Sequence, residues 1–308
     1  MKRFLLLFLT MLMMFLTACS GGTEAADGRL RVVATTDQIT DALTVIAGEA
    51  AAVEGLFGPG IDPHLYVPTE GDVTTLAAAD VIFYNGLHLE AQMTRVLDQM
   101  ESRGTTVVSL GDSLPADRLL RWDDDTPYDP HFWNDPALWI ETMGIIRDTL
   151  AAADPANAAI YEANTAAYIA EIEAVNAFVR QQIDSIAPER RVMITAHDAF
   201  GYFARAYGLE ERGLQGISTE SEAGTQDVQL LADFIVERQI PAIFVESSVP
   251  PDTIEAVQAA VQDRGFAVTI GGELFSDALA EEGHEADNYL GMLQHNARTL
   301  AAALGETP

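Results

Sequence analysis

The stretch 154-DPANAAIYEANTAAYIAEIEAVNAFVRQQIDSI-186 determines how the chain is organised. Asp154 is a predicted helix N-cap with Pro155 at the first helical position, and no glycine or further proline follows within the stretch. Apolar residues recur at spacings of four and three and form a single stripe, made of Tyr168, Ile172, Val175, Val179, Ile183 and Ile186. About 31 residues at 1.5 Å each give a helix of roughly 46 Å. Because the stripe covers fewer than three heptads, we predict a helix that packs within one molecule rather than the seam of a coiled-coil dimer.

Strands and helices alternate on both sides of this helix. Before it, apolar β-branched runs at 30–36, 80–86 and 105–111 are separated from one another by helical patterns at 37–53, 69–79 and 89–100, and a further helical pattern covers 134–150. After it come runs at 191–197, 213–218, 241–247 and 266–272, with helical patterns at 198–208, 226–239 and 251–265 and a terminal helix from about Asn288 to Leu304. Such alternation predicts parallel sheets covered by helices.

The predicted fold class is therefore α/β, with two parallel-sheet α/β lobes joined by one long helix and a ligand site in the cleft between the lobes. We place the N-terminal lobe at 29–152, the linking helix at 153–187 and the C-terminal lobe at 188–308. Strand ends at such a cleft are where α/β proteins bind ligands.

The N-terminus predicts export. Met1-Lys2-Arg3 is positively charged, and Phe4 to Leu16 is an apolar run too short to span a bilayer as a stable helix. It leads into 16-LTAC-19, which resembles a bacterial lipobox. We expect a lipoprotein signal peptide at 1–18, lipidation of Cys19 and a flexible tether over 19–28, so that the protein is anchored to the cell membrane and faces the periplasm or the cell exterior. The alternative is a plain signal peptide with an incidental cysteine.

Composition excludes some partners. The chain has 47 acidic and 17 basic residues and a net charge of −30, so nucleic acid, whose phosphates would be repelled, is a poor partner. Cys19 is the only cysteine, so the folded part has no disulfide, which a chain of this length tolerates. Charge alone does not indicate metal binding.

Three of the six histidines lie where a strand or loop ends and a helix begins. The tripeptide Asp-Pro-His occurs at 62–64 and again at 129–131, and His197 ends the strand 191–197. Proline fixes the backbone in front of His64 and His131, and the preceding aspartate can cap the loop or orient the imidazole. Three imidazoles in equivalent positions predict one shared site.

A fourth group should come from the second lobe. The segment 271-GGELFSDALAEEG-283 contains Asp277 just beyond a strand end, and Glu273 competes with it on spacing. Glu246 ends the strand 241–247 and is a candidate for a supporting position behind a ligand. Phe132 and Trp133 are expected to line the cleft. The remaining histidines, predicted to be structural or solvated, are His88, His284 and His295.

Several motifs in one order resemble a known family. They are the lipobox, 62-DPHLYVPTEGD-72, 129-DPHFW-133, 195-TAHDAFGYFARAYGL-209, 245-VESSVPPDTIEAV-257, 274-LFSDALAEEG-283 and 289-YLGMLQHN-296. Together they resemble the metal-binding solute receptors of ABC importers, and are most similar to the manganese/zinc TroA type of the cluster A-I family. The resemblance runs from Arg29 to the C-terminus. It implies metal ligands at His64, His131, His197 and Asp277 and partnership with the membrane subunits of an ABC permease.

Two departures from the family bear on the metal. Zinc-specialised members carry a long loop rich in histidine and acids, whereas 113–128 is short and has no histidine. Many manganese-specialised members have glutamate where this chain has His197. Three imidazoles and one carboxylate suit zinc or manganese and are compatible with ferrous iron.

The leading interpretation is a monomeric receptor without enzymatic activity. It captures one divalent transition-metal ion between the lobes and delivers it to the permease. The alternative is an exported metallohydrolase that uses three histidines as ligands and an acid such as Asp277 or Glu246 as general base. The sequence has no His-Glu-x-x-His and no Gly-x-Ser-x-Gly motif.

Overall fold

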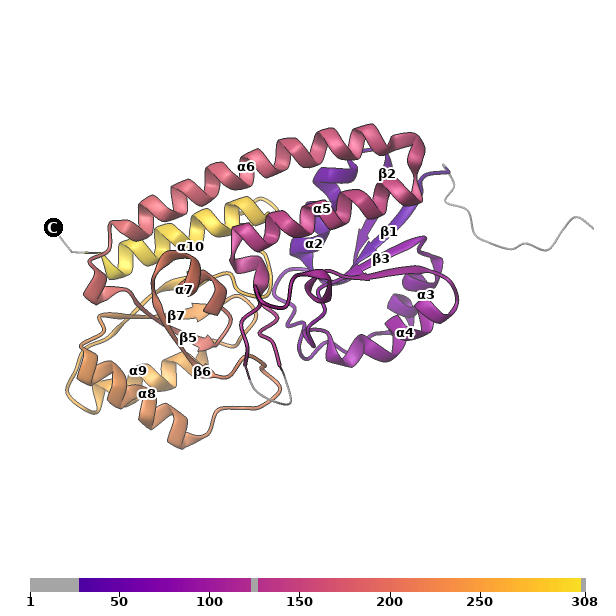
Figure 1. The fold of residues 1–308 in the computed structure, drawn as a ribbon. Coiled ribbons are helices and arrows are strands. Elements are labelled where there is room, and N and C mark those ends of the chain that lie inside the picture. Colours follow the sequence, from indigo (N-terminus) through magenta and orange to yellow (C-terminus); the bar gives the residue numbers. More distant parts are fainter. Residues whose placement is uncertain (1–27, 123–126, 306–308) are drawn as a thin grey trace, which may run out of the picture.

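The protein has two α/β lobes bridged by the long helix α6 (Ala158–Asp184), which runs along both lobes in Figure 1. The computed structural model describes residues 28–122 and 127–305. The predicted signal peptide 1–18 and Cys19 lie outside the described residues. The predicted fold class, α/β with parallel strands in two lobes, is confirmed. Within the described ranges, none of the helices combines the length and the apolar character needed to cross a membrane.

The first lobe contains one parallel sheet of four strands in the order β2-β1-β3-β4. Val32 of the central strand β1 pairs with Val53 on one side and Val81 on the other. The strands are β1 (Leu30–Ala34), β2 (Ala51–Gly55), β3 (Val81–Tyr84) and β4 (Thr106–Ser109). The helices between them are α2 (Asp37–Ala47), α3 (Glu70–Ala78) and α4 (Thr94–Ser102).

The helix predicted at 37–53 is wrong at its C-terminal end. The helical pattern at 37–53 covers α2 but also runs into the first three residues of β2, an edge strand of the sheet. Gly48 adopts φ 53°, a left-handed conformation that ends α2. The alanines at 50–52 favour a helix locally, but the free edge of β1 offers hydrogen bonds that a local pattern cannot anticipate.

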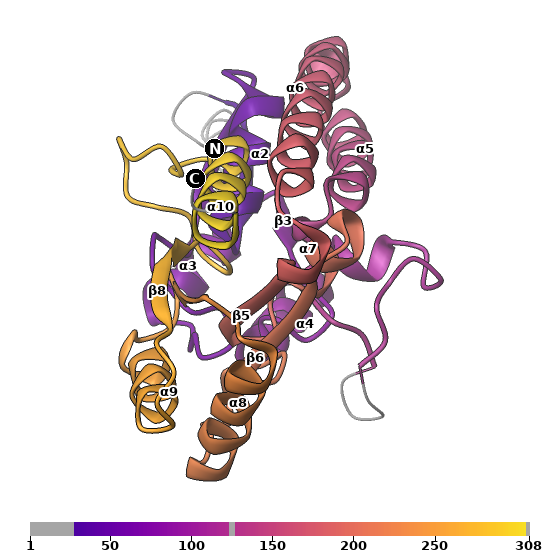
Figure 2. The ribbon, with the colours of Figure 1, turned by 90° about the vertical axis from the view of Figure 1, so that its left-hand side faces the viewer.

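The second lobe contains two parallel strand pairs, β5–β6 and β7–β8, with β5 packed beside β7. Figure 2 shows β5, β6 and β8 with helices α8 and α9 at one end and α10 at the other. The strands are β5 (Val192–His197), β6 (Glu210–Gln215), β7 (Ala242–Glu246) and β8 (Thr269–Leu274). The helices are α7 (Gly201–Tyr207), α8 (Thr225–Arg238), α9 (Asp252–Gln262) and α10 (Tyr289–Leu304).

Helix α6 begins slightly later than predicted. Asp154 does not cap it: a short 3-10 turn over Pro155–Asn157 comes first, and the Asp154 carboxylate accepts hydrogen bonds from Asn157 Nδ2 at 2.7 Å and Tyr161 Oη at 2.8 Å. The predicted apolar stripe is buried at all six positions. It faces α2, α5 (Pro136–Ala153) and α10, so one helix is packed against elements of both lobes.

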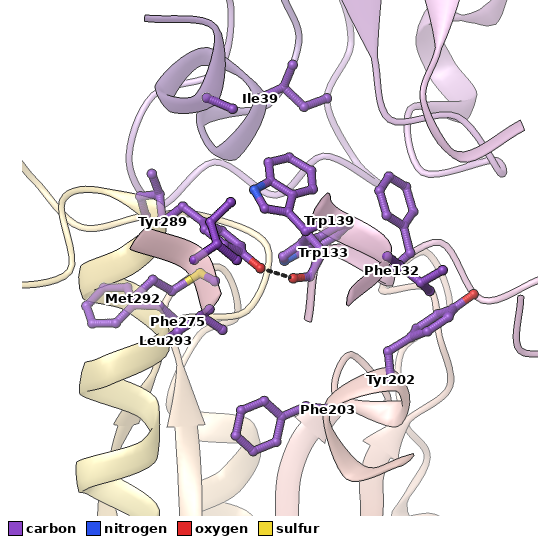
Figure 3. Close-up of a cluster of buried hydrophobic side chains, with 14 of the residues drawn as sticks. Ile39, Phe132, Trp133, Trp139, Tyr202, Phe203, Phe275, Tyr289, Met292 and Leu293 are labelled. Atoms are coloured by element: carbon purple, nitrogen blue, oxygen red, sulfur yellow. Dashed lines mark hydrogen bonds between the residues drawn. The ribbon is translucent and has the colours of Figure 1, made fainter. Parts of the chain in front are cut away.

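An aromatic core fills the space where the lobes meet (Figure 3). Trp139 of α5 stacks on Tyr289 of α10 with ring centroids 5.0 Å apart, and Tyr289 Oη donates a hydrogen bond to the Trp133 carbonyl at 2.8 Å. These side chains are almost fully buried. Because such interiors are close-packed, the contacts fix the loops of the two lobes relative to each other.

Candidate metal centre

The structure brings four of the predicted site residues together. His64 lies in the loop between β2 and α3, His131 precedes α5, His197 is the last residue of β5, and Asp277 follows β8. Each offers a ligand atom within 4.8 Å of the others, and all four residues are buried. They come from both lobes. His64, His197 and Asp277 lie at or after the carboxyl ends of strands, as expected for a ligand site in an α/β protein.

The donor atoms are spaced as ligands of one ion. His64 Nε2 lies 3.3 Å from His131 Nε2, and His197 Nε2 lies 3.1 Å from Asp277 Oδ2. Asp277 Oδ1 is 3.5 Å from His131 Nε2, and Oδ2 is 3.8 Å from His64 Nε2. A tetrahedron built on zinc–ligand bonds of 2.0–2.1 Å has edges of about 3.3 Å. Both oxygens of Asp277 face imidazoles, so one carboxylate can supply one or two donor atoms.

Unsatisfied buried atoms support a cation at this point. Within the described residues, Asp277 Oδ1 is one of the buried side-chain atoms without a hydrogen-bond partner, and His197 Nε2 has only its ion-pair contact with Asp277 Oδ2 at 3.1 Å. A buried polar atom left unpaired costs about 1–3 kcal/mol, and such atoms are uncommon in native structures. One divalent ion bound by both atoms would remove this cost.

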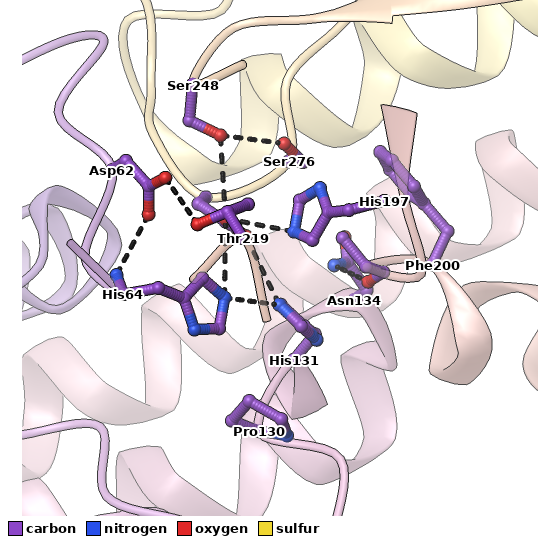
Figure 4. A network of polar contacts seen from close by, with 12 residues as sticks. Asp62, His64, Pro130, His131, Asn134, His197, Phe200, Thr219, Ser248 and Ser276 are labelled. Carbon is purple, nitrogen blue, oxygen red and sulfur yellow. Dashed lines mark hydrogen bonds and ion pairs between the residues drawn. The ribbon is translucent and has the colours of Figure 1, made fainter. Parts of the chain in front are cut away.

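The two Asp-Pro-His motifs have different contacts. Asp129 Oδ1 accepts hydrogen bonds from the backbone N–H of His131 at 2.9 Å and from its ring Nδ1 at 2.7 Å. The bond to Nδ1 leaves the Nε2 lone pair directed at the site. Asp62 also accepts the backbone N–H of its histidine, His64, but its second oxygen accepts the hydroxyl of Thr219 at 2.6 Å (Figure 4). The motif at 129–131 thus orients an imidazole through its ring nitrogen, whereas the motif at 62–64 ties the two lobes together.

Glu246 supports His197 from behind. Its Oε2 lies 2.8 Å from His197 Nδ1, and its Oε1 accepts the backbone N–H groups of Ala196 and His197 at 2.6 and 2.9 Å. Gly213 of β6 allows β6 to pack closely against the end of β5, because a Cβ at Gly213 would lie 2.5 Å from the backbone at His197 and Asp198. Only glycine fits so close to the strand end that carries the imidazole.

Burial and charge set the protonation of the cluster. Burial lowers the pKa of His64 to about 3, so this imidazole is neutral near pH 7. Burial alone would also lower the pKa of His197, but the Glu246 and Asp277 carboxylates outweigh it and raise that pKa well above its usual value. Burial alone would raise the pKa of Asp277, but His197 and the other imidazoles hold it below its usual range. Asp277 is therefore an anion that faces imidazoles.

The other candidate residues lie outside this cluster. Glu273 is exposed at the end of β8, and its carbonyl accepts a hydrogen bond from His295 Nε2 at 3.1 Å. His295 also pairs with Glu285 through Nδ1 at 2.7 Å. His88 and His284 are exposed. Asp277 rather than Glu273 is thus the acid that lies beside the three imidazoles.

Sequence reasoning missed three contacts of the site. Thr219 reaches Asp62 across the lobes, Ser248 Oγ donates to Asp277 Oδ2 at 3.4 Å, and Trp133 Nε1 donates to the Ser276 carbonyl at 3.1 Å. Ser248 and Trp133 lie within motifs that the sequence singled out, 245–257 and 129–133. Thr219 stands in a loop that shows no such pattern.

Comparisons with known proteins show the family to which the chain belongs. Residues 32–303 match the family described as "ZnuA: Zinc-uptake complex component A periplasmic". The zinc-binding protein TroA of Treponema pallidum is 45% identical over 97% of this chain and 96% of its own length, and the manganese-binding lipoprotein MntA of Bacillus subtilis is 40% identical over 94% and 95%. The structure of the periplasmic zinc-binding protein TroA superposes with a TM-score of 0.88 at 44% identity, covering 91% of this chain and 100% of that one. The chain belongs to the ZnuA family of periplasmic metal-binding proteins.

Proposed function

We propose that this protein is the extracytoplasmic receptor of an ABC importer, which binds one divalent transition-metal ion and delivers it to a membrane permease. The observation that carries the proposal is the buried group of three imidazoles and one carboxylate, drawn from both lobes, whose donor atoms all lie within 4.8 Å of one another. Membership of a family of metal-binding receptors supports it. His64, His131, His197 and Asp277 are the proposed ligands, and Glu246 is the proposed support of His197.

The chemistry of capture follows from these side chains. His64 offers a neutral imidazole and His131 a second imidazole from the first lobe, and His197 and Asp277 complete the site from the second. Carboxylates bound to the far nitrogens of His131 and His197 increase the basicity of both imidazoles and thereby strengthen their bonds to a cation. Asp277, Glu246 and Asp129 together bring three negative charges to a site for a dication, which also favours divalent over monovalent ions.

Enclosure supports a transport role over hydrolysis. A hydrolytic metal centre needs an open position for water and substrate, whereas here the four donor residues are at most 3% exposed. We infer that the protein binds and releases its ion without chemical turnover. The named relatives are a zinc-binding protein and a manganese-binding lipoprotein, and the family is described as a component of a zinc-uptake complex.

The proposal also covers the export signal, the lipid anchor, the bounds of the lobes, the oligomeric state and the partners. Residues 1–18 are a lipoprotein signal peptide, and Cys19 carries the lipid that anchors the mature protein to the membrane. The tether at 19–28 leads to lobes at 29–152 and 188–308, joined by 153–187. The protein acts as a monomer, outside the cytoplasm, with permease subunits as partners and without nucleic acid.

We propose zinc or manganese as the ion, with ferrous iron as a compatible third. The ligand set suits all three, and by the Irving–Williams order zinc binds more tightly than manganese at a given site. Relatives carry both zinc and manganese in their names. Elemental analysis of the protein isolated from its own cell envelope would identify the ion loaded in the cell.

Metal titration of single variants tests the ligand set. His64→Ala, His131→Ala and Asp277→Ala should each lower the affinity for zinc and manganese at least 100-fold, because each removes one ligand. His88→Ala is the matched control, since His88 is exposed and lies outside the cluster. If His64→Ala and Asp277→Ala both bind as tightly as the parent, the proposed site is wrong.

A further inference from the structure

The segment that carries Asp277 is held by side chains of the other lobe. The Ser276 carbonyl accepts a hydrogen bond from Trp133 Nε1 at 3.1 Å and a longer one from Gln38 Nε2 at 3.5 Å. The backbone N–H of Leu279 donates to Asp37 Oδ2 at 2.7 Å. These bonds flank Asp277 on both sides in the sequence. We call Asp37, Gln38 and Trp133 the clamp.

The clamp belongs to the first lobe and to its His131 loop. Asp37 and Gln38 begin α2, and Trp133 lies two residues after His131 with its ring packed edge-on against that imidazole at 5.3 Å between centroids. The Trp133 carbonyl accepts the Tyr289 hydroxyl, so both ends of this residue contact the second lobe. Trp133, Gln38 and Ser276 are 2%, 1% and 0% exposed. Little water can therefore replace these bonds.

The second lobe also holds this segment, through side chains of its own. Asn296 of α10 accepts the backbone N–H of Phe275 at 2.9 Å and donates to its carbonyl at 2.8 Å. Beyond Phe275, the second lobe contributes the Ser248 hydroxyl, which lies 3.4 Å from Asp277 Oδ2 and 3.3 Å from Ser276 Oγ, and the Ser247 hydroxyl, which donates to the Ala278 carbonyl at 2.9 Å. The clamp of the first lobe adds its own bonds on both sides of Asp277. The carboxylate that completes the site is thus positioned by residues of both lobes, and the first-lobe clamp supplies the part that crosses the cleft.

We propose that Trp133 and Asp37 are positioning residues for metal capture: they hold the Asp277 carboxylate against the imidazoles of the first lobe and thereby slow the release of the ion. The inference rests on the proposed function, because it assigns their effect to the residence time of the metal. Trp133 acts through Ser276 and Asp277 and is not itself a ligand. Rupture of the clamp as the lobes separate would free Asp277 and release the ion.

Trp133→Phe is the sharpest variant, because it removes the N–H donor and keeps an aromatic ring in the core. Zinc and manganese release from the full chain, measured by stopped flow with a chelator in excess, should be about 10-fold faster, the lower end of what loss of a ligand's outer support costs. Asp37→Ala should also accelerate release, whereas Asp37→Asn keeps an acceptor for the Leu279 N–H and should stay within about 3-fold of the parent.

A double variant separates positioning from general structural damage. If Trp133 acts through Asp277, then Trp133→Phe should not accelerate release further in the Asp277→Ala background. A cobalt-loaded Trp133→Phe protein should also show a changed visible spectrum, since the coordination by Asp277 is altered. Equal acceleration in both backgrounds, or a release rate equal to the parent, would overturn the inference. If the parent itself binds neither zinc nor manganese, the proposed function fails instead.

Discussion

Glu246 contacts His197 at two points, through the ring Nδ1 at 2.8 Å and through the backbone N–H at 2.9 Å. One carboxylate therefore fixes both the position of the strand end and the rotation of the imidazole. Both side chains are buried, so no water competes for these contacts. The arrangement matches the carboxylate–histidine pairs that orient metal ligands in proteins.

Glu246→Gln should lower the affinity for zinc or manganese by about 10- to 100-fold at pH 8, because His197 loses its negatively charged support. Competition with a chelator of known affinity would measure the loss. Glu285→Gln is a matched control, since Glu285 forms a similar pair with His295 at 2.7 Å on the surface and outside the site. An equal loss in both variants would show that the effect is not specific to the site.

Metal binding should release one proton near neutral pH. Glu246 and Asp277 overcome the effect of burial and raise the pKa of His197, so the metal-free protein carries a proton there. Affinity should fall about tenfold for each pH unit between pH 8 and pH 6, because that proton competes with the ion. The pKa of His64, lowered by burial to about 3, keeps it neutral throughout this range.

Calorimetric titration in two buffers of different ionisation enthalpy would count the released proton directly. The same titration of Glu246→Gln should show fewer protons released, because one of the two carboxylates that raise the pKa of His197 is neutralised. Affinity that stays constant from pH 8 to pH 6 would contradict the assignment of His197 as a protonated group in the metal-free protein.

The aspartates of the two Asp-Pro-His motifs should differ in their effect on metal affinity. Asp129→Asn weakens the contact to His131 Nδ1 and should lower metal affinity about 10-fold. Asp62→Asn leaves the His64 ring without direct change, because Asp62 contacts the backbone N–H and Thr219, so affinity should stay within about 3-fold. Metal titration of both variants under the same conditions would compare their affinities. Similar losses in the two would show that the aspartates share one role.

Gly213→Ala should destabilise the protein by about 1–3 kcal/mol, because the new methyl group would collide with backbone at His197 and Asp198. Its metal affinity should also fall, since the collision displaces the strand end that carries His197. Gly144→Ala in α5 is the control: a Cβ there meets nothing closer than 4.0 Å, so helix propensity should stabilise the protein by about 0.5–1 kcal/mol. Urea unfolding measures both changes, and a Gly213→Ala protein as stable as the parent would contradict the packing described here.

The sequence predicted the α/β class, the long helix and the four residues that the structure brings together. These features leave local signals: a stripe at spacings of four and three in α6, and histidines placed at strand ends. Strand β2 was mistaken for helix because its pairing with β1 depends on residues far away in the chain. Asp154 was predicted to cap α6 and instead binds the side chains of Asn157 and Tyr161.

Local sequence also fails to predict which residues hold the proposed ligands in place. Asp129 and Asp62 stand in identical tripeptides, and only the fold decides which of them meets a ring nitrogen. The bond from Trp133 to Ser276 joins positions 143 residues apart, so no local pattern can reveal it. Local chemistry therefore predicted the three imidazoles and the family resemblance added Asp277, whereas the groups that hold them in place required the three-dimensional structure.

Asp37 should make the metal-free protein less stable as pH rises. Burial raises the pKa of Asp37 from 3.8 to about 7, so between these values the folded state keeps a proton that the unfolded chain has lost. Stability falls with pH wherever the folded state binds more protons, so the cost is absent below about pH 4 and complete above about pH 7. Asp37→Asn removes the ionisable group and keeps an acceptor for Leu279. It should exceed the parent in unfolding free energy by on the order of 1–2 kcal/mol at pH 8, and much less at pH 5. Urea unfolding with a chelator present, at pH 5, 6, 7 and 8, would measure the difference, and a constant difference across this range would show that Asp37 does not titrate with folding.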